Sequence, residues 1–524
     1  MKLNYSALKN KEEWSLKNIK TPLFDVEAVR AETLEVPRWL HFGAGNIFRA
    51  FIASCQDELL NRGLSKTGII AVETFDEAII DEIYKPHDNL ALVTTLKETG
   101  EIENKVVASV VESFKGSTDF SMLKEIFKKS SLQMVSFTIT EKGYAIKDSQ
   151  GELLPIITQD LSSQFSNPKH IMSMITALLF ERFLNGADPI TLVSMDNCSH
   201  NGDKLRAAVI ELGQQLETQA RDIKGFVSYI SDVTKVSFPL TMIDKITPRP
   251  SEKIGESLQA LGFEDTDIVI TEKNTYMAPF VNAEETQYLV IEDCFTNGRP
   301  ALDEATGVIF TDRATVNNVE TMKVTTCLNP LHTALAIFGC LLDYKTISDE
   351  MKDEDLSELV RQMAYNEGLK AVIDPGIISP NEFVNEVLNK RFPNEFIVDT
   401  PQRIATDTSQ KLGIRYGVTI RSYMERDDLN VQDLKLIPLV IAGWLKYLDG
   451  INDNGETFEL SPDPMMPQLR VLKEDKRQLL SNKAIFGVDL YKIGLGEKIA
   501  SIYEEMSAGN GGIRATVKKY LIQE

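Results

Sequence analysis

Residues 39–51 read WLHFGAGNIFRAF, and this stretch predicts how the first half of the chain folds. Trp39–Phe42 has the short, apolar composition of a buried β-strand, and Gly43 and Gly45 follow it directly. The residues after the glycines have helical character. A strand, a tight glycine turn and a helix in this order are typical of an α/β domain built on a parallel sheet.

The glycine turn is also suited to binding a dinucleotide. Gly43 and Gly45 allow the backbone to approach a pyrophosphate, which then lies at the helix N-terminus, where free N–H groups favour negative charge. Phe48 replaces the third glycine of the GxGxxG pattern, and similar turns occur in proteins that bind no nucleotide. The turn alone therefore leaves both interpretations open.

An acidic residue follows at the expected distance. The stretch 68–76 predicts a second strand that ends in Glu73. A carboxylate there would accept hydrogen bonds from a ribose diol and repel a 2′-phosphate, which favours NAD over NADP. The alternative is a solvated strand end with no ligand.

Alternating strands and helices continue to about residue 300. Further strands are expected within 90–96, 105–114, 134–144 and 190–197, and helices around 170–186 and 203–219. After residue 300 the strand signal fades, and helices are expected at 330–345, 349–373, 380–390, 404–425 and 433–448. The sequence thus predicts a Rossmann-like α/β domain over 1–300, with an N-terminal extension, and a mostly α-helical domain over 301–524.

Composition narrows the possible functions. With 524 residues the chain is too long for one ordinary core, and its net charge of −21 disfavours binding to nucleic acid or an anionic membrane surface. We expect no signal peptide and no membrane span. The five cysteines are scattered without a CxxC pair, which fits a reducing cytoplasm. Five histidines and no HExxH motif predict a protein without a metal site.

A second stretch, KVTTCLNPLHTALAIFGCLL (323–342), places three polar residues ahead of an apolar helix. Asn329 followed by Pro330 predicts a helix start, with the asparagine as its cap. Each polar residue has a structural interpretation of its own: Lys323 a surface cation, Asn329 a cap, His332 a buried histidine. For any one of them that interpretation is the simpler one.

Taken together, the three residues suit hydride transfer between an alcohol and a nicotinamide. That reaction needs a base for the hydroxyl proton and a polarising site for the carbonyl oxygen. Lys323 could be the base, and Asn329 with the helix N-terminus could stabilise the oxygen.

Seven stretches in order give the chain a recognisable resemblance: HFGAGNIFRAF, FTITEKGY, VSMDNCSHNG, TMIDKITP, YLVIED, KVTTCLNPLH and RIATDTSQK. The sequence resembles the polyol-specific long-chain dehydrogenases, the mannitol dehydrogenase family, over nearly its whole length. Within that family the CLNPLHTAL wording is most similar to the members that act on hexuronates, the fructuronate reductases.

The resemblance implies roles for particular residues. Lys323 would be the general acid/base, Asn197 and Asn329 would form the oxyanion site, and His332 would contact substrate hydroxyls. Asp244, Arg403 and Lys411 would line the substrate pocket, and Arg49 would meet the coenzyme pyrophosphate. The family works without a metal. One departure concerns spacing: members that act on mannitol have the lysine five residues before the asparagine, whereas Lys323 is six residues before Asn329. Either the lysine precedes the helix, or a bulge absorbs the extra residue.

The resulting expectation is an NAD-dependent reduction of a 2-keto hexuronate, D-fructuronate to D-mannonate. The alternatives within the family are reduction of D-tagaturonate and oxidation of a neutral polyol such as mannitol. A non-catalytic sugar or NAD sensor is a more distant alternative.

Overall fold

The computed structural model describes residues 1–219 and 224–521, which form two compact units. The first unit comprises Met1–Leu96 and Gly100–Val316, and the second comprises Lys97–Thr99 and Asn317–Glu524. The sequence placed the division at 300/301. The chain stays in the first unit longer than that because β15 (Val308–Thr311) pairs with β14 (Tyr288–Glu292).

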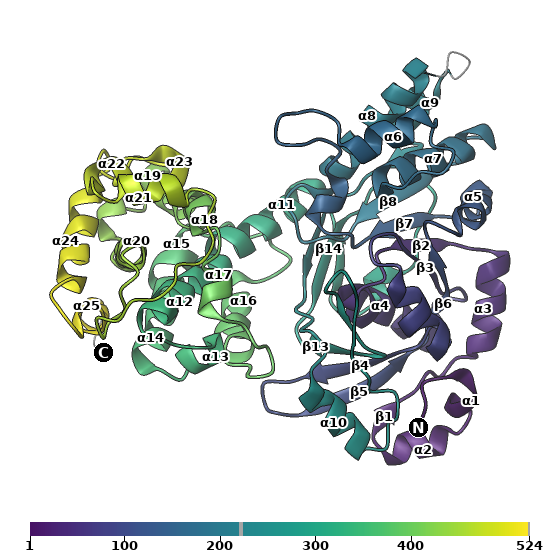
Figure 1. Ribbon diagram of the computed structural model, residues 1–524, viewed down its shortest axis with the longest axis horizontal. Helices are drawn as coiled ribbons and strands as arrows, with labels where there is room; N and C mark the ends of the chain where they lie inside the picture. The colour runs from purple at the N-terminus through teal and green to yellow at the C-terminus, as the bar shows by residue number, and fades with distance from the viewer. Residues whose placement is uncertain (220–223, 522–524) are drawn as a thin grey trace. The chain divides into compact units, whose positions relative to one another are not determined.

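A six-stranded sheet forms the centre of the first unit (Figure 1). Every neighbouring pair in it is parallel, as expected for strands joined by helical crossovers. In spatial order its strands are β6 (Val110–Lys115), β3 (Ile69–Glu73), β2 (Trp39–Phe42), β7 (Met134–Phe137), β8 (Ile190–Ser194) and β9 (Val236–Ser237).

Side chains alternate between the two faces of this sheet, and both faces are buried. Leu40 and Phe42 belong to one hydrophobic cluster, whereas Trp39 belongs to another. The first cluster includes apolar residues of α5, α7 and α8, and the second includes residues of α4. Burial on both faces explains why these strands are apolar at nearly every position.

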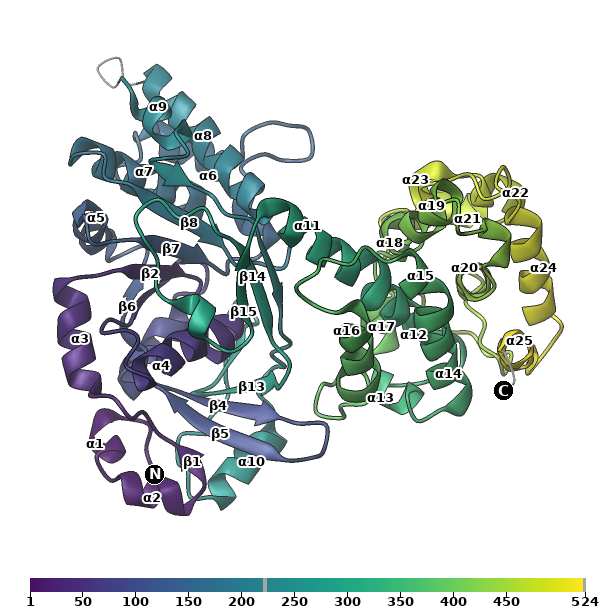
Figure 2. The same cartoon turned by 180° about the vertical axis from the view of Figure 1, so that it is seen from behind.

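The helices of the first unit surround its sheets, with α1, α2 and α10 beside β1, β4 and β5 (Figure 2). They are α1 (Tyr5–Leu8), α2 (Lys11–Leu16), α3 (Val26–Glu35), a π-helical turn η1 (Phe48–Ile52), α4 (Ala53–Asn61), a π turn η2 (Ile80–Tyr84), η3 (Lys85–His87), α5 (Phe120–Lys128), η4 (Glu141–Tyr144), α6 (Pro155–Ser162), α7 (Ile171–Leu184), α8 (Asn201–Gln219), α9 (Phe226–Ser231), α10 (Glu252–Ala260) and η5 (Leu302–Glu304).

Three smaller sheets complete the first unit. β1 (Ile19–Lys20), β5 (Ile102–Val107), β4 (Ala91–Leu96) and β13 (Phe280–Glu284) form one; β10 (Thr241–Asp244), β14 and β15 form another; β11 (Val269–Ile270) pairs with β12 (Tyr276–Met277). The single strand expected over 105–114 is two strands, β5 and β6, that belong to different sheets. The strand expected over 134–144 ends at Phe137, where the chain turns towards η4.

Within the described residues the second unit is helical, apart from an isolated bridge between Ile451 and Thr457. Its helices are α11 (Arg313–Met322), which begins in the first unit, a π turn η6 (Lys323–Cys327), α12 (Asn329–Leu341), α13 (Ile347–Glu350), α14 (Glu354–Gln362), a π turn η7 (Met363–Gly368), α15 (Leu369–Ala371), α16 (Pro380–Glu386), a π turn η8 (Val387–Arg391), α17 (Pro401–Ile404), α18 (Thr408–Arg415), α19 (Gly417–Glu425), η9 (Val431–Asp433), α20 (Leu436–Tyr447), α21 (Met466–Leu472), α22 (Lys476–Leu480), α23 (Lys483–Phe486), α24 (Gly496–Met506) and α25 (Gly512–Tyr520).

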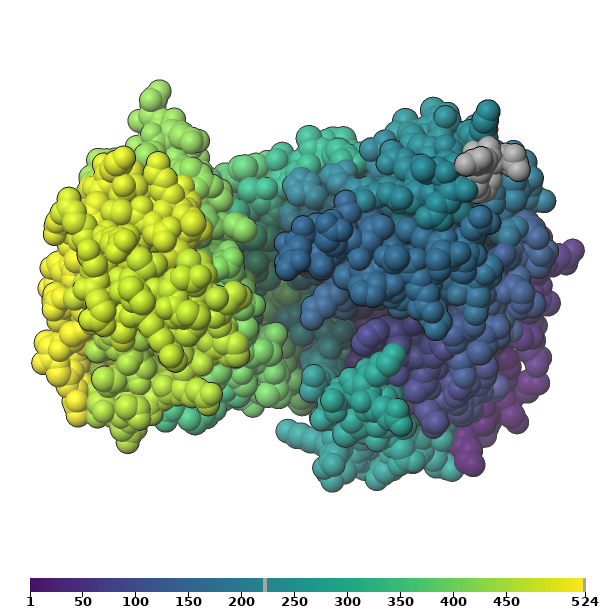
Figure 3. All heavy atoms as spheres, turned by 45° about the horizontal axis from the view of Figure 1, so that its top comes forward, coloured from purple at the N-terminus to yellow at the C-terminus, as the bar shows by residue number. Residues whose placement is uncertain are grey.

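Two nearly all-apolar helices, α12 and α20, pack against each other in the core of this unit. The last part of the chain, yellow in Figure 3, covers one of its faces. Residues Arg313–Leu341 form a 29-residue helical run that is long and apolar enough to cross a membrane. However, 78% of its apolar window is buried inside the structure, as in the core helix of a globular domain.

Candidate active site

The glycine turn is held rigidly against the neighbouring strands. The N–H of Gly43 donates to the carbonyl of Val72 at 2.8 Å, and the hydroxyl of Thr138 donates to the carbonyl of Gly43 at 3.0 Å. Gly43 has φ +102°, and a Cβ there would lie 2.1 Å from the carbonyl oxygen of Thr138. Only glycine fits this position.

Phe48, at the position of the missing third glycine, explains how the motif departs from the usual pattern. Its ring stacks on His41 with centroids 4.0 Å apart and 7° between the planes. His41 is fully buried, and its Nδ1 lies 2.6 Å from the hydroxyl of Ser136. Burial lowers the pKa of His41 to about 3, so the ring is neutral and acts as a packing partner of the helix.

Glu73 binds the backbone of the turn. One carboxylate oxygen accepts the N–H of Ala44 at 2.8 Å, and the other accepts those of Thr74 and Phe75 at 2.9 and 2.8 Å. The hydroxyl of Tyr84 donates to the Ala44 carbonyl at 2.9 Å, which fixes the turn from the other side. Glu73 is therefore a structural clamp whether or not it also contacts a ribose.

A cavity of about 630 Å³ opens beside the turn, within the size range of small-ligand sites. Gly43, Gly45 and Glu73 line it, so it brings together three of the four residues predicted to bind the coenzyme. A Cβ on Gly45 would meet no atom within 4 Å, so the space beside this backbone is open. Close backbone approach with free space beside it fits a bound pyrophosphate.

The fourth predicted residue, Arg49, does not point into this cavity. Its side chain is 1% exposed, and its guanidinium donates to the carbonyl of Ala278 at 2.7 Å and to the side chain of Asn46 at 2.8 Å. The expected contact between Arg49 and a pyrophosphate is therefore corrected: Arg49 fixes the first turn of the helix. Three cations not singled out from the sequence line the cavity: Lys142, Lys169 and Lys273.

A buried carboxylate holds two residues of the cavity lining, Ile139 and Thr140. Asp196, in the DN pair that contains Asn197, accepts the N–H groups of Ile139 and Thr140 at 3.0 and 2.8 Å. It also accepts the hydroxyl of Tyr144 at 2.5 Å. These bonds hold Thr140 at φ +63°, which is unusual for a threonine. Of the DN pair, Asp196 is structural and buried, whereas Asn197 is exposed.

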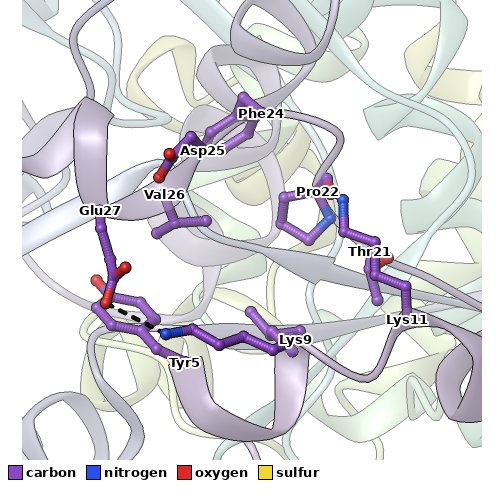
Figure 4. Close-up of a pocket in the computed structure, with 10 residues that line it drawn as sticks. Tyr5, Lys9, Lys11, Thr21, Pro22, Phe24, Asp25, Val26 and Glu27 are labelled. Carbon is purple, nitrogen blue, oxygen red and sulfur yellow. Dashed lines mark hydrogen bonds and ion pairs between the residues drawn. The ribbon is translucent and has the colours of Figure 1, made fainter.

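A smaller hollow of about 210 Å³ lies among the N-terminal segments (Figure 4). Residues between Tyr5 and Glu27 line it, and Lys9 reaches to 3.7 Å from the Glu27 carboxylate. It contains none of the predicted site residues.

In the second unit, a π turn separates Lys323 from Asn329. The N–H of Leu328 donates to the carbonyl of Lys323 at 3.1 Å, an i+5 bond in place of the i+4 bond of an α-helix. A π turn contains one residue more than an α turn and occurs frequently at functional sites. Both explanations for the six-residue spacing hold in the structure: Lys323 precedes α12, and the π turn between them contains the extra residue.

Helix α12 starts one residue away from the prediction. It begins at Asn329, with Leu328 in the cap position and Pro330 in the first turn. Asn329 is not the cap, so its side chain is not used to start the helix. Among the described residues the side-chain amides of Asn329 and Asn197 form no hydrogen bond. Asn197 belongs to the first unit and Asn329 to the second. Unpaired amides are what an oxygen ligand requires.

His332 lies in the first turns of α12 beside Asp399, with 3.5 Å between Nε2 and the carboxylate. Burial lowers the pKa of His332 to about 4, opposed by Asp399 and reinforced by Arg415, Arg403 and Arg391. The imidazole is therefore neutral near pH 7 and can both donate and accept a hydrogen bond.

Arg403 contributes to the lowered pKa of His332, and both Arg403 and Lys411 have protein partners of their own. Arg403 forms a two-pronged ion pair with Asp399, with distances of 2.7 and 2.5 Å. The ammonium of Lys411 donates to the carbonyl of Thr406. Burial, followed by the charge of Arg415, lowers the pKa of Lys411 below its usual value. Asp399 and Arg415 were missed from the sequence: Asp399 is four residues before Arg403, just ahead of α17, and Arg415 is four residues after Lys411 on α18.

The remaining predicted residues are buried. Asp244 is the last residue of β10, 5% exposed, and Lys323 is 4% exposed. Asp244 belongs to the first unit, whereas Lys323, Asn329, His332, Arg403 and Lys411 belong to the second. Across residues 1–219 and 224–521, no three His, Cys, Asp or Glu side chains gather in a way that could hold a metal ion.

Comparison with known proteins assigns the class. Residues 37–304 match the model of the mannitol dehydrogenase Rossmann domain, and residues 315–507 match that of the mannitol dehydrogenase C-terminal domain. The chain belongs to the mannitol dehydrogenase family. The expected enzyme class, an NAD-dependent oxidoreductase acting on CH–OH groups, is confirmed at the level of the family.

Particular relatives narrow the comparison. The D-mannonate oxidoreductase of Thermotoga maritima is 48% identical over the full length of both chains. The D-mannonate oxidoreductase of Escherichia coli is 28% identical, with 86% of this chain and 88% of the relative covered.

Solved structures agree with the fold. A substrate-free D-sorbitol dehydrogenase has a TM-score of 0.81 and 25% identity, covering 96% of this chain and 99% of its own. The mannitol 2-dehydrogenase of Pseudomonas fluorescens, solved with NAD and D-mannitol, has a TM-score of 0.73 and 27% identity, covering 99% of each chain. The predicted Rossmann-like domain followed by a helical one is confirmed.

Proposed function

We propose that this enzyme reduces D-fructuronate to D-mannonate with NADH. The observation that carries the proposal is the full-length 48% identity to a D-mannonate oxidoreductase. A cationic group of residues around His332 supports an acidic sugar as the substrate, because the chain as a whole is strongly acidic.

We propose that the coenzyme occupies the cavity beside Gly43 and Gly45. When bound, NADH supplies the hydride for the keto carbon. The open space beside Gly45 allows close approach of a pyrophosphate, and Lys142, Lys169 and Lys273 offset its charge. Glu73 retains acceptor capacity on the oxygen that binds Ala44, so a ribose hydroxyl can donate to it.

The proton and the developing charge are assigned to residues of this chain. Lys323, as an ammonium, is proposed to protonate the alkoxide oxygen as it forms. The unpaired amides of Asn197 and Asn329 are proposed to donate hydrogen bonds to that oxygen. Neutral His332 is proposed to bind substrate hydroxyls, with Asp244, Arg403 and Lys411 around them.

We also propose a cytoplasmic location. The five cysteines are all free in the structure, which fits a reducing compartment.

The test is NADH oxidation by the purified protein with D-fructuronate, D-tagaturonate and D-fructose in parallel. The proposal predicts the highest kcat/KM for D-fructuronate. A preference for D-tagaturonate or for uncharged D-fructose would replace it with one of the other activities of the family. No turnover of any of the three would favour a non-catalytic sugar or NAD sensor.

A further inference from the structure

Arg415, the last residue of α18, is a partly buried cation, and within the described residues it has no counter-ion. Its only hydrogen bond among the described residues goes to the hydroxyl of Thr333, and no carboxylate in that part of the chain forms an ion pair with it. Burial lowers its pKa to about 10. An unpaired buried charge is costly, and it persists where a ligand completes it.

Arg415 lies at the end of α12 that carries the proposed catalytic residues. Its partner Thr333 directly follows His332, and the Thr333 hydroxyl donates to the carbonyl of Asn329 at 2.9 Å. The neighbouring Tyr416 donates to the carbonyl of Pro330 at 2.7 Å, which ties the end of α18 to the first turn of α12. The charge of Arg415 also contributes to the lowered pKa of His332.

The other cations near His332 are less suited to binding an anion. Arg403 is neutralised by its two-pronged pair with Asp399, and its side chain is 71% exposed. Lys411 is one helical turn before Arg415 and donates to a backbone carbonyl. A guanidinium presents a planar fork that matches a carboxylate, and only one prong of the Arg415 fork is used by Thr333.

We propose that Arg415 binds the carboxylate of the sugar acid and thereby makes the enzyme select a hexuronate over a neutral ketose. Thr333 positions the guanidinium beside His332 and leaves its remaining N–H groups for the two oxygens of the substrate. The inference rests on the proposed function, since it requires an acidic substrate.

The experiment compares D-fructuronate with D-fructose, which lacks the carboxylate, in wild type, Arg415→Gln and Arg415→Lys. We expect Arg415→Gln to raise KM for D-fructuronate about 10- to 100-fold, the range of a lost charge-assisted hydrogen bond. For D-fructose, the same substitution should change turnover by less than about threefold. Arg415→Lys keeps the charge but loses the planar fork of the guanidinium, so its KM for D-fructuronate should lie between those of wild type and Arg415→Gln.

The matched control is Arg421→Gln on α19, whose guanidinium donates to the carbonyl of Gly487 at 3.3 Å and should leave both substrates unaffected. Thermal unfolding and NADH binding of each variant show whether the fold is intact. If Arg415→Gln does not fold, addition of guanidinium to Arg415→Ala should restore turnover of D-fructuronate selectively.

Two outcomes would overturn the inference: equal losses for both sugars, or no loss for D-fructuronate in a folded variant. Failure of the proposed function is visible separately, as absent wild-type turnover of D-fructuronate. In that case calorimetric binding of D-mannonate to the NAD-saturated protein still decides the role of Arg415. Binding lost in Arg415→Gln supports the inference, whereas binding kept, or absent in wild type, rejects it.

Discussion

The N–H of Leu328 donates to the carbonyl of Lys323 at 3.1 Å, an i+5 bond that defines a π turn. This turn compensates for the rotation that a spacing of six residues, instead of five, would cause between Lys323 and Asn329. Each residue of an α-helix turns the chain by about 100°, so one extra residue would point Lys323 away from the direction it has at a spacing of five. The π turn contains that extra residue and leaves the helices on either side in register. We therefore expect the π turn to set the direction of the Lys323 side chain relative to Asn329.

Deleting one residue of the π turn should therefore be tolerated. We expect a variant lacking Val324 to fold with a regular α turn and to keep kcat/KM within about tenfold of wild type. Inserting an alanine after Val324 should rotate Lys323 by about 100° and lower kcat/KM at least about 100-fold. NADH oxidation and circular dichroism measure the two effects. Equal losses in the two variants would show that the turn has no role in setting the register.

Replacing the proposed proton donor should separate chemistry from coenzyme binding. Lys323→Ala should lower kcat by roughly 100- to 10,000-fold, the usual contribution of a general acid. NADH binding, followed by protein fluorescence, should be unchanged, because the glycine turn belongs to the other unit. Lys345→Ala, which removes a 72% exposed lysine paired with Asp343, is the control and should retain full activity. Retained turnover in Lys323→Ala would show that another residue is the general acid.

The parts of the fold that depend on local sequence could be predicted from it. Trp39–Phe42 is found as the expected strand, because a short apolar run followed by glycine has few alternatives. The prediction of a single strand over 105–114 was wrong, because the two halves of this segment pair in different sheets. Apolar composition does not specify the partner of a strand. β15 was missed for the same reason: it is short, and its place in the first unit depends on its pairing with β14.

For the candidate site, too, local features could be predicted from the sequence and tertiary contacts could not. The residue types at the mouth of α12 indicated the chemistry, because few reactions use a lysine, an amide and an imidazole together. Charge pairing was not visible, because it depends on tertiary contacts. Arg49 was expected to face a ligand and instead bonds to Ala278, more than two hundred positions away in the sequence. Arg415 had no distinguishing pattern and is identified only by its missing counter-ion.

The two glycines of the turn should respond differently to alanine. At Gly43 a methyl group would clash with the Thr138 carbonyl at a positive φ, so Gly43→Ala should destabilise the first unit by roughly 2–5 kcal/mol. At Gly45 the methyl group would enter open space in the cavity, so stability should be nearly unchanged. Gly45→Ala should instead weaken NADH binding at least about tenfold. Thermal unfolding measures the effect on stability, and fluorescence titration measures NADH binding. Normal NADH affinity in Gly45→Ala would show that the coenzyme does not bind in this cavity.

Two histidines, the buried His41 and the partly buried His332, should make the fold sensitive to mild acid. The pKa values of His41 and His332 are lowered to about 3 and about 4, whereas a histidine in the unfolded chain has a pKa of about 6.5. The stability that each contributes is complete above about pH 6.5, and it is lost as the pH falls towards the folded-state value. Each should reduce the free energy of unfolding by up to about 1.4 kcal/mol per pH unit in that window.

NMR of histidine-labelled protein should then show that the imidazole signals of His41 and His332 do not titrate between about pH 7 and pH 5. His41→Asn and His332→Asn assign the two signals and should each reduce the acid sensitivity of their own unit. Titration of either ring near its ordinary pKa would contradict the buried, neutral state.

A buried glutamate should give the opposite pH dependence. Both carboxylate oxygens of Glu350 lack a hydrogen-bond partner among the described residues, and one lies where a Cβ on Gly339 would be. Burial, followed by the charges of Asp353, Asp349 and Asp399, raises its pKa well above the usual value. The folded state thus retains a proton that the unfolded chain loses above about pH 4.3, so stability falls as the pH rises beyond that value.

Glu350→Met should remove this penalty, since it replaces an unsatisfied carboxyl group by an apolar chain of similar length. Near pH 7 we expect the variant to be more stable than wild type by roughly 1–3 kcal/mol, and near pH 4 the gain should be smaller. Calorimetric unfolding at the two pH values measures it. Glu354→Met, at an exposed position in the first turn of α14, is the control and should lose up to about 1 kcal/mol through the helix dipole. Destabilisation of Glu350→Met near neutral pH would mean that the carboxyl group is required in the core.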